Sequence, residues 1–443
     1  MGHLLAVRKG EDVMSTMTGN LRRTILFGVI GTLVVMGAVK LARADVASDK
    51  PGAILVFPKI VVDTSGLLGP PTDTEIQITN TSNSVISARC YVINSNSHCS
   101  NAPSTVCTAA AVAAGAPPGA GGCPTGGTCV GPCSPRLVEN DFRLTLTKRQ
   151  PVTWKAREPL QVFPCDAQGC SFGNNAGSRW PGVQEDPFVG EIKCVEVCPE
   201  GNPTCTAEQP IPGLDPANGF TGDLKGEATI VSTSGSLADA RKYNAIGIQS
   251  LGFGTNNGDD TLAVGGPNAE YNGCPKQLIV DNLFDYSVVP THGGELLSQV
   301  TTDLTFVPCT EDLATQSPSA STLQFLVYNE FEQRFSTSIS FTCFKEVQLA
   351  DIDTRPGPFG NAQSIFSVFV QGTLGGQIRI RPVAGATIDN RVLAVSEQFW
   401  SCSSGPDGTC TAAANVNLVQ GAGEGDQVCL EGATGAEGCT IMH

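Results

Sequence analysis

The sequence is poor in histidine, in aromatic residues and in charge. Only four of its 443 residues are histidine, 6% are aromatic and 16% are charged. The haem-attachment motif Cys-x-x-Cys-His is missing, and no two cysteines have the Cys-x2-Cys spacing that is typical of zinc sites. The formal net charge is −15, and such an acid excess repels phosphate backbones and anionic lipids. We therefore expect no haem, no structural zinc and no nucleic-acid partner.

An export signal is predicted at residues 1–44. Arg22 and Arg23 precede an apolar run over residues 25–39, and the motif Ala42-Arg43-Ala44 follows it. A basic segment, a short apolar segment and an Ala-x-Ala site are the parts of a cleavable signal peptide. The run is shorter than the roughly 18 residues of a membrane span, so cleavage is favoured over an uncleaved anchor. The sequence thus predicts a secreted, extracellular, cell-surface or periplasmic protein, which contacts a membrane only if the signal is retained.

Eighteen cysteines follow the predicted signal. An even number of cysteines in an exported chain indicates disulfide bonds. Their pairing does not follow from the sequence, but nine of them are the disulfide candidates: Cys90, Cys194, Cys198, Cys205, Cys343, Cys402, Cys410, Cys429 and Cys439. Cys90 shares a strand face with apolar residues, which suggests a disulfide between two sheets.

The fold is predicted from turn residues and from alternation. The chain contains 50 glycines and 29 prolines, which favour short strands joined by turns. Residues 74–80 alternate with period two and place Ile76 and Ile78 on one face, as in a half-buried strand. Strands about ten residues apart with turn signals between them are typical of sandwiches. We therefore expect an all-β fold of two antiparallel immunoglobulin-like β-sandwich domains, stapled by disulfides and carrying long irregular loops.

The strand pattern of the first half recurs in the second half. Residues 323–327, 339–343 and 366–370 follow the order of residues 76–78, 86–92 and 142–146, and a Cys loop follows the last strand in both halves. We interpret this recurrence as a divergent internal duplication. The predicted organisation is a first sandwich over 45–296 with long Cys/Gly/Pro-rich insertions, a second over 297–402, and a Gly/Ala-rich, cysteine-containing appendage over 403–443.

Few side chains suit catalysis. A catalytic triad or a Cys-His dyad needs a histidine, and His98 and His292 both lie in turn-like polar stretches. Glu185, Asp186 and Glu191 are the acids that a glycosidase-like carboxylate pair would use, although adjacent acids are common on an acidic surface. We therefore expect no enzymatic activity.

Two further features are candidates for binding. Trp180 lies in the irregular stretch 178–182 and is the aromatic side chain that we consider for a role in binding. The segment 254–266 is similar to one turn of the calcium-binding repeats of secreted bacterial proteins, in which glycines allow tight turns and aspartates bind the ion. This resemblance makes Asp259 and Asp260 calcium candidates, while a plain Asn/Gly/Asp turn explains the same residues.

The sequence therefore favours a non-enzymatic secreted or cell-surface protein with a structural, adhesive or partner-binding role. Its partner would be an unidentified protein or a cell surface. The alternative is a secreted hydrolase that uses carboxylates and binds calcium.

Overall fold

The computed structural model describes part of the chain. It covers residues 46–430 except 108–122, 125, 134–137, 163–164, 167–168, 171–177, 184, 203–204, 207–208, 211–221, 235–236, 252–258, 267, 291–296, 354, 357–361, 384–390, 402–408 and 421–425. The predicted signal peptide, His292, Cys402 and Cys439 therefore lie outside the described residues. A search of the described residues for a helix long and apolar enough to span a membrane finds none.

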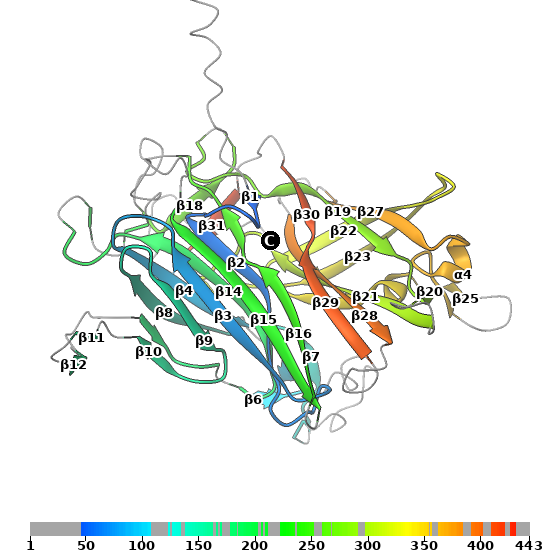
Figure 1. Cartoon of the computed structure of the whole chain (residues 1–443), viewed down its shortest axis with the longest axis horizontal. Coiled ribbons are helices and arrows are strands. Elements are labelled where there is room, and N and C mark those ends of the chain that lie inside the picture. The colour runs from blue at the N-terminus through cyan, green and yellow to red at the C-terminus, as the bar shows by residue number, and fades with distance from the viewer. Residues whose placement is uncertain are drawn as a thin grey trace, which may run out of the picture. The chain divides into compact units, whose positions relative to one another are not determined.

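The first half of the chain folds into two antiparallel sheets that share a core (Figure 1). Sheet 1 contains, in spatial order, β1 (Val46–Ala47), β17 (Ile246–Ile248), β2 (Ile54–Val62), β14 (Phe188–Val197), β4 (Ile86–Asn94) and β8 (Val138–Leu146). Sheet 2 contains β16 (Leu237–Asn244), β15 (Leu224–Ser234), β3 (Thr72–Asn80) and β9 (Pro151–Lys155). Ile76 and Ile78 of β3 point into the core between the sheets, as their alternation predicts.

The second half forms another pair of antiparallel sheets with its own core (Figure 1). Sheet 3 contains β23 (Arg334–Thr342), β22 (Ala320–Asn329), β27 (Gly375–Pro382), β19 (Pro275–Leu283) and β30 (Asn417–Gln420). Sheet 4 contains β20 (Ser287–Pro290), β21 (Leu297–Pro308), β28 (Val392–Ser401) and β29 (Thr409–Asn415), and β24 (Lys345–Gln348) also pairs with β21. Phe306, Phe325 and Phe366 pack against one another in this core.

A third core joins the two sheet pairs. Ile54 and Val56 of β2, on the outer face of sheet 1, belong to one buried cluster with Val307 of β21 and Leu393 of β28. Sheet 1 is therefore buried on both faces, which explains why β2 is an almost continuous apolar run rather than an alternating one.

The remaining described elements are short. They are the three-stranded sheet of β5 (Ser97–Cys99), β6 (Ala102–Val106) and β7 (Cys129–Pro132), the pairs β10 (Leu160–Val162) with β13 (Ser178–Trp180), β11 (Cys165–Asp166) with β12 (Gly169–Cys170), β18 (Thr261–Val264) with β31 (Asp426–Cys429) and β25 (Arg355–Pro356) with β26 (Ala362–Gln363), and the helices α3 (Leu349–Ile352) and α4 (Val368–Gln371).

The all-β, antiparallel part of the prediction is confirmed, but one predicted strand is a helix. Residues 366–370 were expected to be extended, and α4 occupies residues 368–371 instead. The Ser367 side chain accepts a hydrogen bond from the Phe369 N–H, and Gly372 ends the helix in the left-handed region at φ 68°. A serine cap and a terminal glycine stabilise a single helical turn that a short apolar pattern does not distinguish from a strand.

The sheets also extend past the predicted boundaries. Strands β19 and β20 precede residue 297 and pair with strands of the second sheet pair, as do β29 and β30 of the predicted appendage. The two halves share the pairings β2 with β14 and β21 with β28, and the pairings β3 with β9 and β22 with β27. The third strands differ, because β4 lies in the sheet of β14 whereas β23 lies beside β22. Duplication stays a prediction.

A disulfide between Cys133 and Cys343 also connects the halves, across 210 residues of sequence. Replacing both cysteines by serine should lower the free energy of unfolding by about 5 kcal/mol in the chain-entropy model, since the loop released is long. The Cys198–Cys205 bond spans seven residues, and its removal should cost only about 2 kcal/mol. Urea denaturation of the two double-serine variants measures the difference, and a larger loss for the short loop would contradict the expectation.

Candidate functional site

The most unusual side chains of the protein are two lysines on the outer face of sheet 1. The side chains of Lys59 in β2 and Lys193 in β14 are only 5% and 3% exposed. A β-bulge places Lys59, because Pro58 and Lys59 together lie opposite the single residue Glu191 of β14. Proline has no N–H to donate to a neighbouring strand, and bulges are positions where strands accept it. Both lysines therefore point towards the second sheet pair.

Two carboxylates of the second sheet pair bind Lys59. Its Nζ lies 2.6 Å from Oε1 of Glu346 in β24, and it also contacts Oε2 of Glu397 in β28. Arg241 of β16 adds a second cation, with Nε 3.4 Å from Oε1 of Glu397. The Lys59 N–H donates to the hydroxyl of Tyr243 at 3.1 Å, and that hydroxyl donates to the Lys59 carbonyl. We call these five residues the Lys59 cluster.

The carboxylates of the Lys59 cluster keep Lys59 protonated. Burial disfavours the ammonium form of Lys59, but Glu346 and Glu397 outweigh burial and raise the pKa of Lys59 above its ordinary value of 10.5. A lysine is a nucleophile or a base only when it is deprotonated. Lys59 is therefore a permanent cation, and the two glutamates are its counterions.

A second cluster surrounds Lys193. Its Nζ lies 2.6 Å from Oε2 of Glu311 and 3.3 Å from Oε2 of Glu191, and it donates to the Pro308 carbonyl at 2.9 Å. Burial and the negative charge of Glu311 raise the pKa of Glu191 well above its ordinary value. Glu191 therefore binds its proton more tightly than an exposed glutamate does, and it lies beside the ion pair of Lys193 and Glu311.

Two buried aspartates, Asp303 beside the Lys59 cluster and Asp285, also have raised pKa values. Burial raises the pKa of Asp303 in β21 to about 7, and the negative charge of Glu346 adds to this effect. Burial likewise raises the pKa of Asp285 to about 6, although it accepts hydrogen bonds from the N–H groups of Thr302 at 2.8 Å and Ala350 at 2.9 Å. Glu346 and Glu397 favour the neutral form of Asp303 although Lys59 opposes them, and the negative charge of Asp351 favours the neutral form of Asp285.

The acids that the sequence suggested for a hydrolase have separate partners. Glu185 accepts a 2.8 Å hydrogen bond from Nε2 of His98, whose side chain is 2% exposed, and two more from asparagine side chains. Burial opposes ionisation of Glu185, but these hydrogen bonds outweigh it and lower its pKa. Asp186 accepts from the N–H of Thr64 at 2.9 Å, while Glu191 belongs to the Lys193 cluster. The structure thus gives each acid a different set of neighbours.

Trp180 lies in the core between sheets 1 and 2 and is 1% exposed. Its ring packs edge-on against Phe142 at 4.7 Å and tilted against Trp154 at 5.7 Å, measured between ring centroids. Its Nε1 donates to the Ala156 carbonyl at 3.0 Å. Trp180 is the last residue of β13 and turns inward, so its ring packs in the core and does not form an exposed platform for a ligand.

The two calcium candidates have protein partners. Asp260 Oδ1 lies 3.2 Å from a guanidinium nitrogen of Arg89, and the Asp260 carbonyl accepts from the Leu430 N–H at 2.9 Å. Asp259 Oδ1 accepts from the Thr261 N–H at 2.8 Å, which is the contact of an Asx turn. These contacts support the plain-turn interpretation, and residues 252–258 lie outside the described part of the chain.

The cysteines form the disulfides Cys90–Cys194, Cys99–Cys123, Cys107–Cys129, Cys133–Cys343, Cys198–Cys205 and Cys274–Cys309 among the described residues. The Cys90 bond joins neighbouring strands of one sheet rather than two sheets, because Cys90 and Cys194 are register partners with Cα atoms 4.0 Å apart. Cys410 and Cys429 lie in β29 and β31, but their side chains lie outside the described part.

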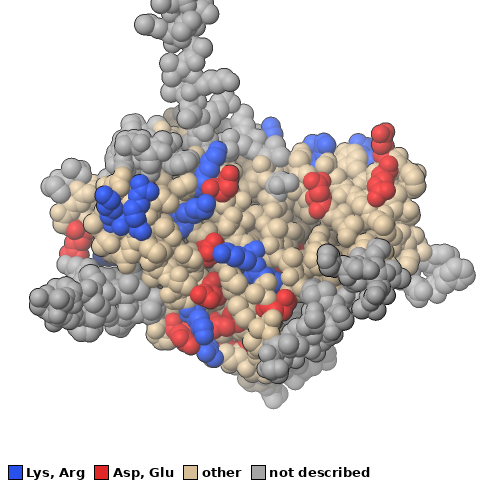
Figure 2. Space-filling view, viewed as in Figure 1, with Lys and Arg blue, Asp and Glu red and all other residues tan. Residues whose placement is uncertain are grey.

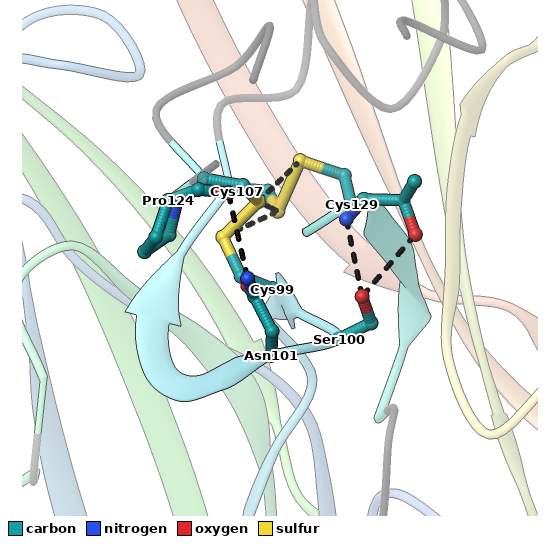
Figure 3. The surroundings of a disulfide bond; sticks show 8 residues. Cys99, Ser100, Asn101, Cys107, Pro124 and Cys129 are labelled. Carbon is teal, nitrogen blue, oxygen red and sulfur yellow. Dashed lines mark hydrogen bonds between the residues drawn. A yellow bond between two sulfur atoms is a disulfide. The ribbon is translucent and has the colours of Figure 1, made fainter. Parts of the chain in front are cut away.

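Two of these disulfides pack against each other (Figure 3). The sulfur atoms of Cys107 and Cys123, which belong to different bonds, are 3.6 Å apart, and those of Cys99 and Cys107 are 3.8 Å apart. Sulfurs this close have the spacing of metal ligands. A metal binds thiolates, and all four sulfurs are consumed in disulfides, so the oxidised cluster staples β5, β6 and β7 together.

One string has the Gly-x-Ser-x-Gly spacing of a serine nucleophile elbow, namely residues 169–173. Gly169 and Cys170 form β12, which pairs with β11 in a short hairpin, and Ser171 lies outside the described residues. A nucleophile elbow follows a strand of a large sheet and opens a helix, with a histidine within reach. His98, the histidine within the described residues, is hydrogen-bonded through Nε2 to Glu185 at 2.8 Å.

An open groove of about 390 Å³ lies beside strands of sheet 2. Its charged lining residues are Asp73, Glu75, Lys155 and Arg157, and three threonines, Pro71 and Val231 complete the lining. Arg157 Nε lies 3.8 Å from Oδ2 of Asp73. In Figure 2, which shows the face where sheet 2 lies in Figure 1, charges of both signs are interspersed among uncharged residues.

No known protein-family model matches the chain, and no curated protein sequence is similar to it.

Replacing Lys59 tests the buried cluster. Lys59→Met leaves the Glu397 carboxylate buried without its closest cation, so we expect a loss of about 3–5 kcal/mol in the free energy of unfolding. Lys242→Met is the matched control, because Lys242 makes a contact of the same 2.6 Å length with Glu227 while 55% exposed. That surface pair should contribute less than about 1 kcal/mol. Urea denaturation measures both variants, and equal losses would show that burial adds nothing.

Asp303 makes stability depend on pH. Its pKa is about 7 in the folded protein and ordinarily 3.8, so folding takes up a proton. The protonated form of Asp303 is compatible with the fold, so its contribution to the free energy of unfolding is fully present below about pH 4. This contribution is lost as the pH rises through about 7. Asp303→Asn should therefore raise the melting temperature at pH 8 and leave it nearly unchanged at pH 4. Asp281→Asn, at an exposed position of β19, is the control, and a pH-independent effect of Asp303→Asn would refute the assignment.

Proposed function

We propose that this protein is a non-enzymatic structural, adhesive or partner-binding protein of the cell surface or extracellular space, built from two fused immunoglobulin-like sandwiches. One observation carries the proposal: the buried lysines and the carboxylates that contact them are counterions of one another inside the interface between the two sheet pairs. Lys59 and Lys193 are at most 5% exposed and remain charged, so their role is to join the sheet pairs. The disulfides indicate an oxidising environment of the kind found outside the cytosol.

A rigid scaffold suits a binding role. The third core, the two charge clusters and the Cys133–Cys343 bond all connect the same two sheet pairs. Such multiple connections hold surface features in a fixed relation, which reduces the entropy lost when a partner binds. Recognition in sandwiches is usually carried by surfaces and loops that the core positions.

The groove beside sheet 2 is the surface that we assign to the partner. Lys155 and Arg157 supply cations, and Asp73 and Glu75 supply anions, in one open hollow. The Asp73 side chain is only 22% exposed, and this burial raises its pKa. A polar protein segment bearing charges of both signs would match this lining, because each ion would meet an opposite charge.

A carboxylate-dependent hydrolase is the second candidate, and one observation favours it. Asp303 has a pKa of about 7, as a general acid requires, and it lies close to Glu346 and Glu397. In a hydrolase the second carboxylate must be available to a water molecule or to the substrate. Here the Lys59 ammonium lies between the two glutamates, and Glu397 is 1% exposed.

Assays of hydrolysis separate the two candidates. The disulfide-intact protein is incubated with chromogenic glycosides, esters and peptides, with and without Ca²⁺, and we expect no turnover above buffer. Turnover that disappears in Asp303→Asn or Ser171→Ala but survives in the control Asp281→Asn would contradict the proposal and identify the acid or the nucleophile.

Binding is tested with fluorescently labelled protein on cells that export it. We expect saturable binding that Arg157→Glu weakens by about tenfold, because the groove would lose one cation and gain an anion. Lys225→Glu is the control, since Lys225 is an exposed residue of the same sheet outside the groove lining. Equal effects of both variants would show that net charge, and not the groove, governs binding.

A further inference from the structure

Strand β23 is an unprotected sheet edge. Among the described strands β22 is its one neighbour, and the two pair over nine consecutive residues without a register shift. The strand RFSTSISFT carries a single charge, Arg334, and no proline. Natural proteins commonly protect such edges with charges, prolines or bulges, because a long flat edge invites pairing with another chain.

The hydrogen bonds at both ends of the β22–β23 hairpin show how the backbone of β23 is oriented. The Asn329 N–H donates to the Gln333 carbonyl at 3.2 Å, and the Cys343 N–H donates to the Ser319 carbonyl at 2.7 Å. Hydrogen-bonded positions alternate along an antiparallel pair. The odd-numbered residues of 333–343 therefore bond to β22. The even-numbered residues direct their N–H and C=O groups outward: Arg334, Ser336, Ser338, Ser340 and Thr342. The Thr342 carbonyl, at the end of the strand, already accepts from the Phe344 N–H at 2.8 Å.

The side chains of β23 divide in the same alternation. The even-numbered ones are exposed. Phe335 and Ile339 are half-buried and pack at the margin of the second core, while Phe341 is buried in it. The core of the second sheet pair therefore extends to the edge strand β23. There the partly exposed surfaces of Phe335 and Ile339 lie beside the outward-facing N–H and C=O groups.

The sequence of β23 reads almost the same in both directions about Ser338. Phe335 and Phe341 lie three residues to either side, and Ser336 and Ser340 lie two residues to either side. An antiparallel pairing of two copies needs this symmetry, because residues equidistant from the two-fold axis face each other.

We propose that β23 pairs antiparallel with β23 of a second copy of this chain, about a two-fold axis at Ser338. In this register every outward-facing residue meets an outward-facing residue, which gives about eight main-chain hydrogen bonds when the occupied Thr342 carbonyls are left out. Phe335 lies opposite Phe341 of the second copy, and aromatic pairs are favourable cross-strand neighbours. Arg334 lies opposite Thr342, so no like charges meet. The pairing uses up both edges, and the assembly stops at a dimer.

Charge substitutions test this register on the full, disulfide-intact chain. Residues 336 and 340 of opposite copies face each other, so Ser336→Lys with Ser340→Lys places like charges opposite in both pairs. We expect the dissociation constant of the dimer to rise by about 30-fold, measured by sedimentation velocity. The matched variant Ser336→Lys with Ser340→Glu puts opposite charges together and should keep the dimer. Both variants change the same exposed positions, so a folding defect would affect them alike.

Proline at Ser338 gives a second, independent readout. Its N–H points away from β22, so Ser338→Pro should spare the hairpin but remove donors at the centre of the dimer. We expect a monomer with an unchanged far-ultraviolet circular dichroism spectrum. The proposal is overturned if the unmodified chain is monomeric at all concentrations up to hundreds of micromolar. It is also overturned if the dimer persists in both disruptive variants, or if slow amide exchange at Ser338 in a monomer shows that the same chain covers the edge.

Discussion

Burial of sheet 1 on both of its faces is the constraint on which the rest of the structure depends. One face packs against sheet 2, and the other packs against the second sheet pair. A strand buried on two sides cannot keep a charge unless a counterion comes with it. The second sheet pair supplies these counterions, with Glu346 and Glu397 beside Lys59 and Glu311 beside Lys193. The β-bulge at Pro58 and the hydrogen bonds between the Lys59 backbone and the Tyr243 hydroxyl orient Lys59 towards these glutamates.

Buried ion pairs of this kind determine how the two sheet pairs are arranged more than they add to the stability of the fold. Removing two charges from water costs several kcal/mol for each ion, and the attraction between them returns a similar amount. A misplaced interface would leave Lys59 or Lys193 without carboxylates, at a cost that an apolar interface would not impose. We therefore regard the two clusters as the reason that the sheet pairs meet in one register. The apolar residues around them, such as Val56 and Leu393, supply the hydrophobic stabilisation.

Local patterns predict this fold well where one face of a strand meets water and poorly where both are covered. Ile76 and Ile78 alternate with polar residues and lie in the core as expected. Glu191 and Lys193 alternate in the same manner, yet both are buried, because the protein that covers them is encoded more than one hundred residues later. The single lysine in the apolar run 53–62 was the available signal for a buried ion pair. Trp180 and the partner of Cys90 were missed for a related reason, since both depend on which strands become neighbours.

The contact between Lys59 and Glu397 also constrains when the chain can fold. Their positions are 338 residues apart, so almost the whole sequence must be present before Lys59 meets its counterion. Contacts of such long range slow folding, because the chain must close a large loop before it gains any energy. Sheets 1 and 2 are synthesised first. Until the second sheet pair forms, the outer apolar face of sheet 1 and the cation of Lys59 are exposed. Apolar surface that stays exposed during folding promotes aggregation, so the late arrival of the second sheet pair makes the first half of the chain the part most at risk before folding is complete.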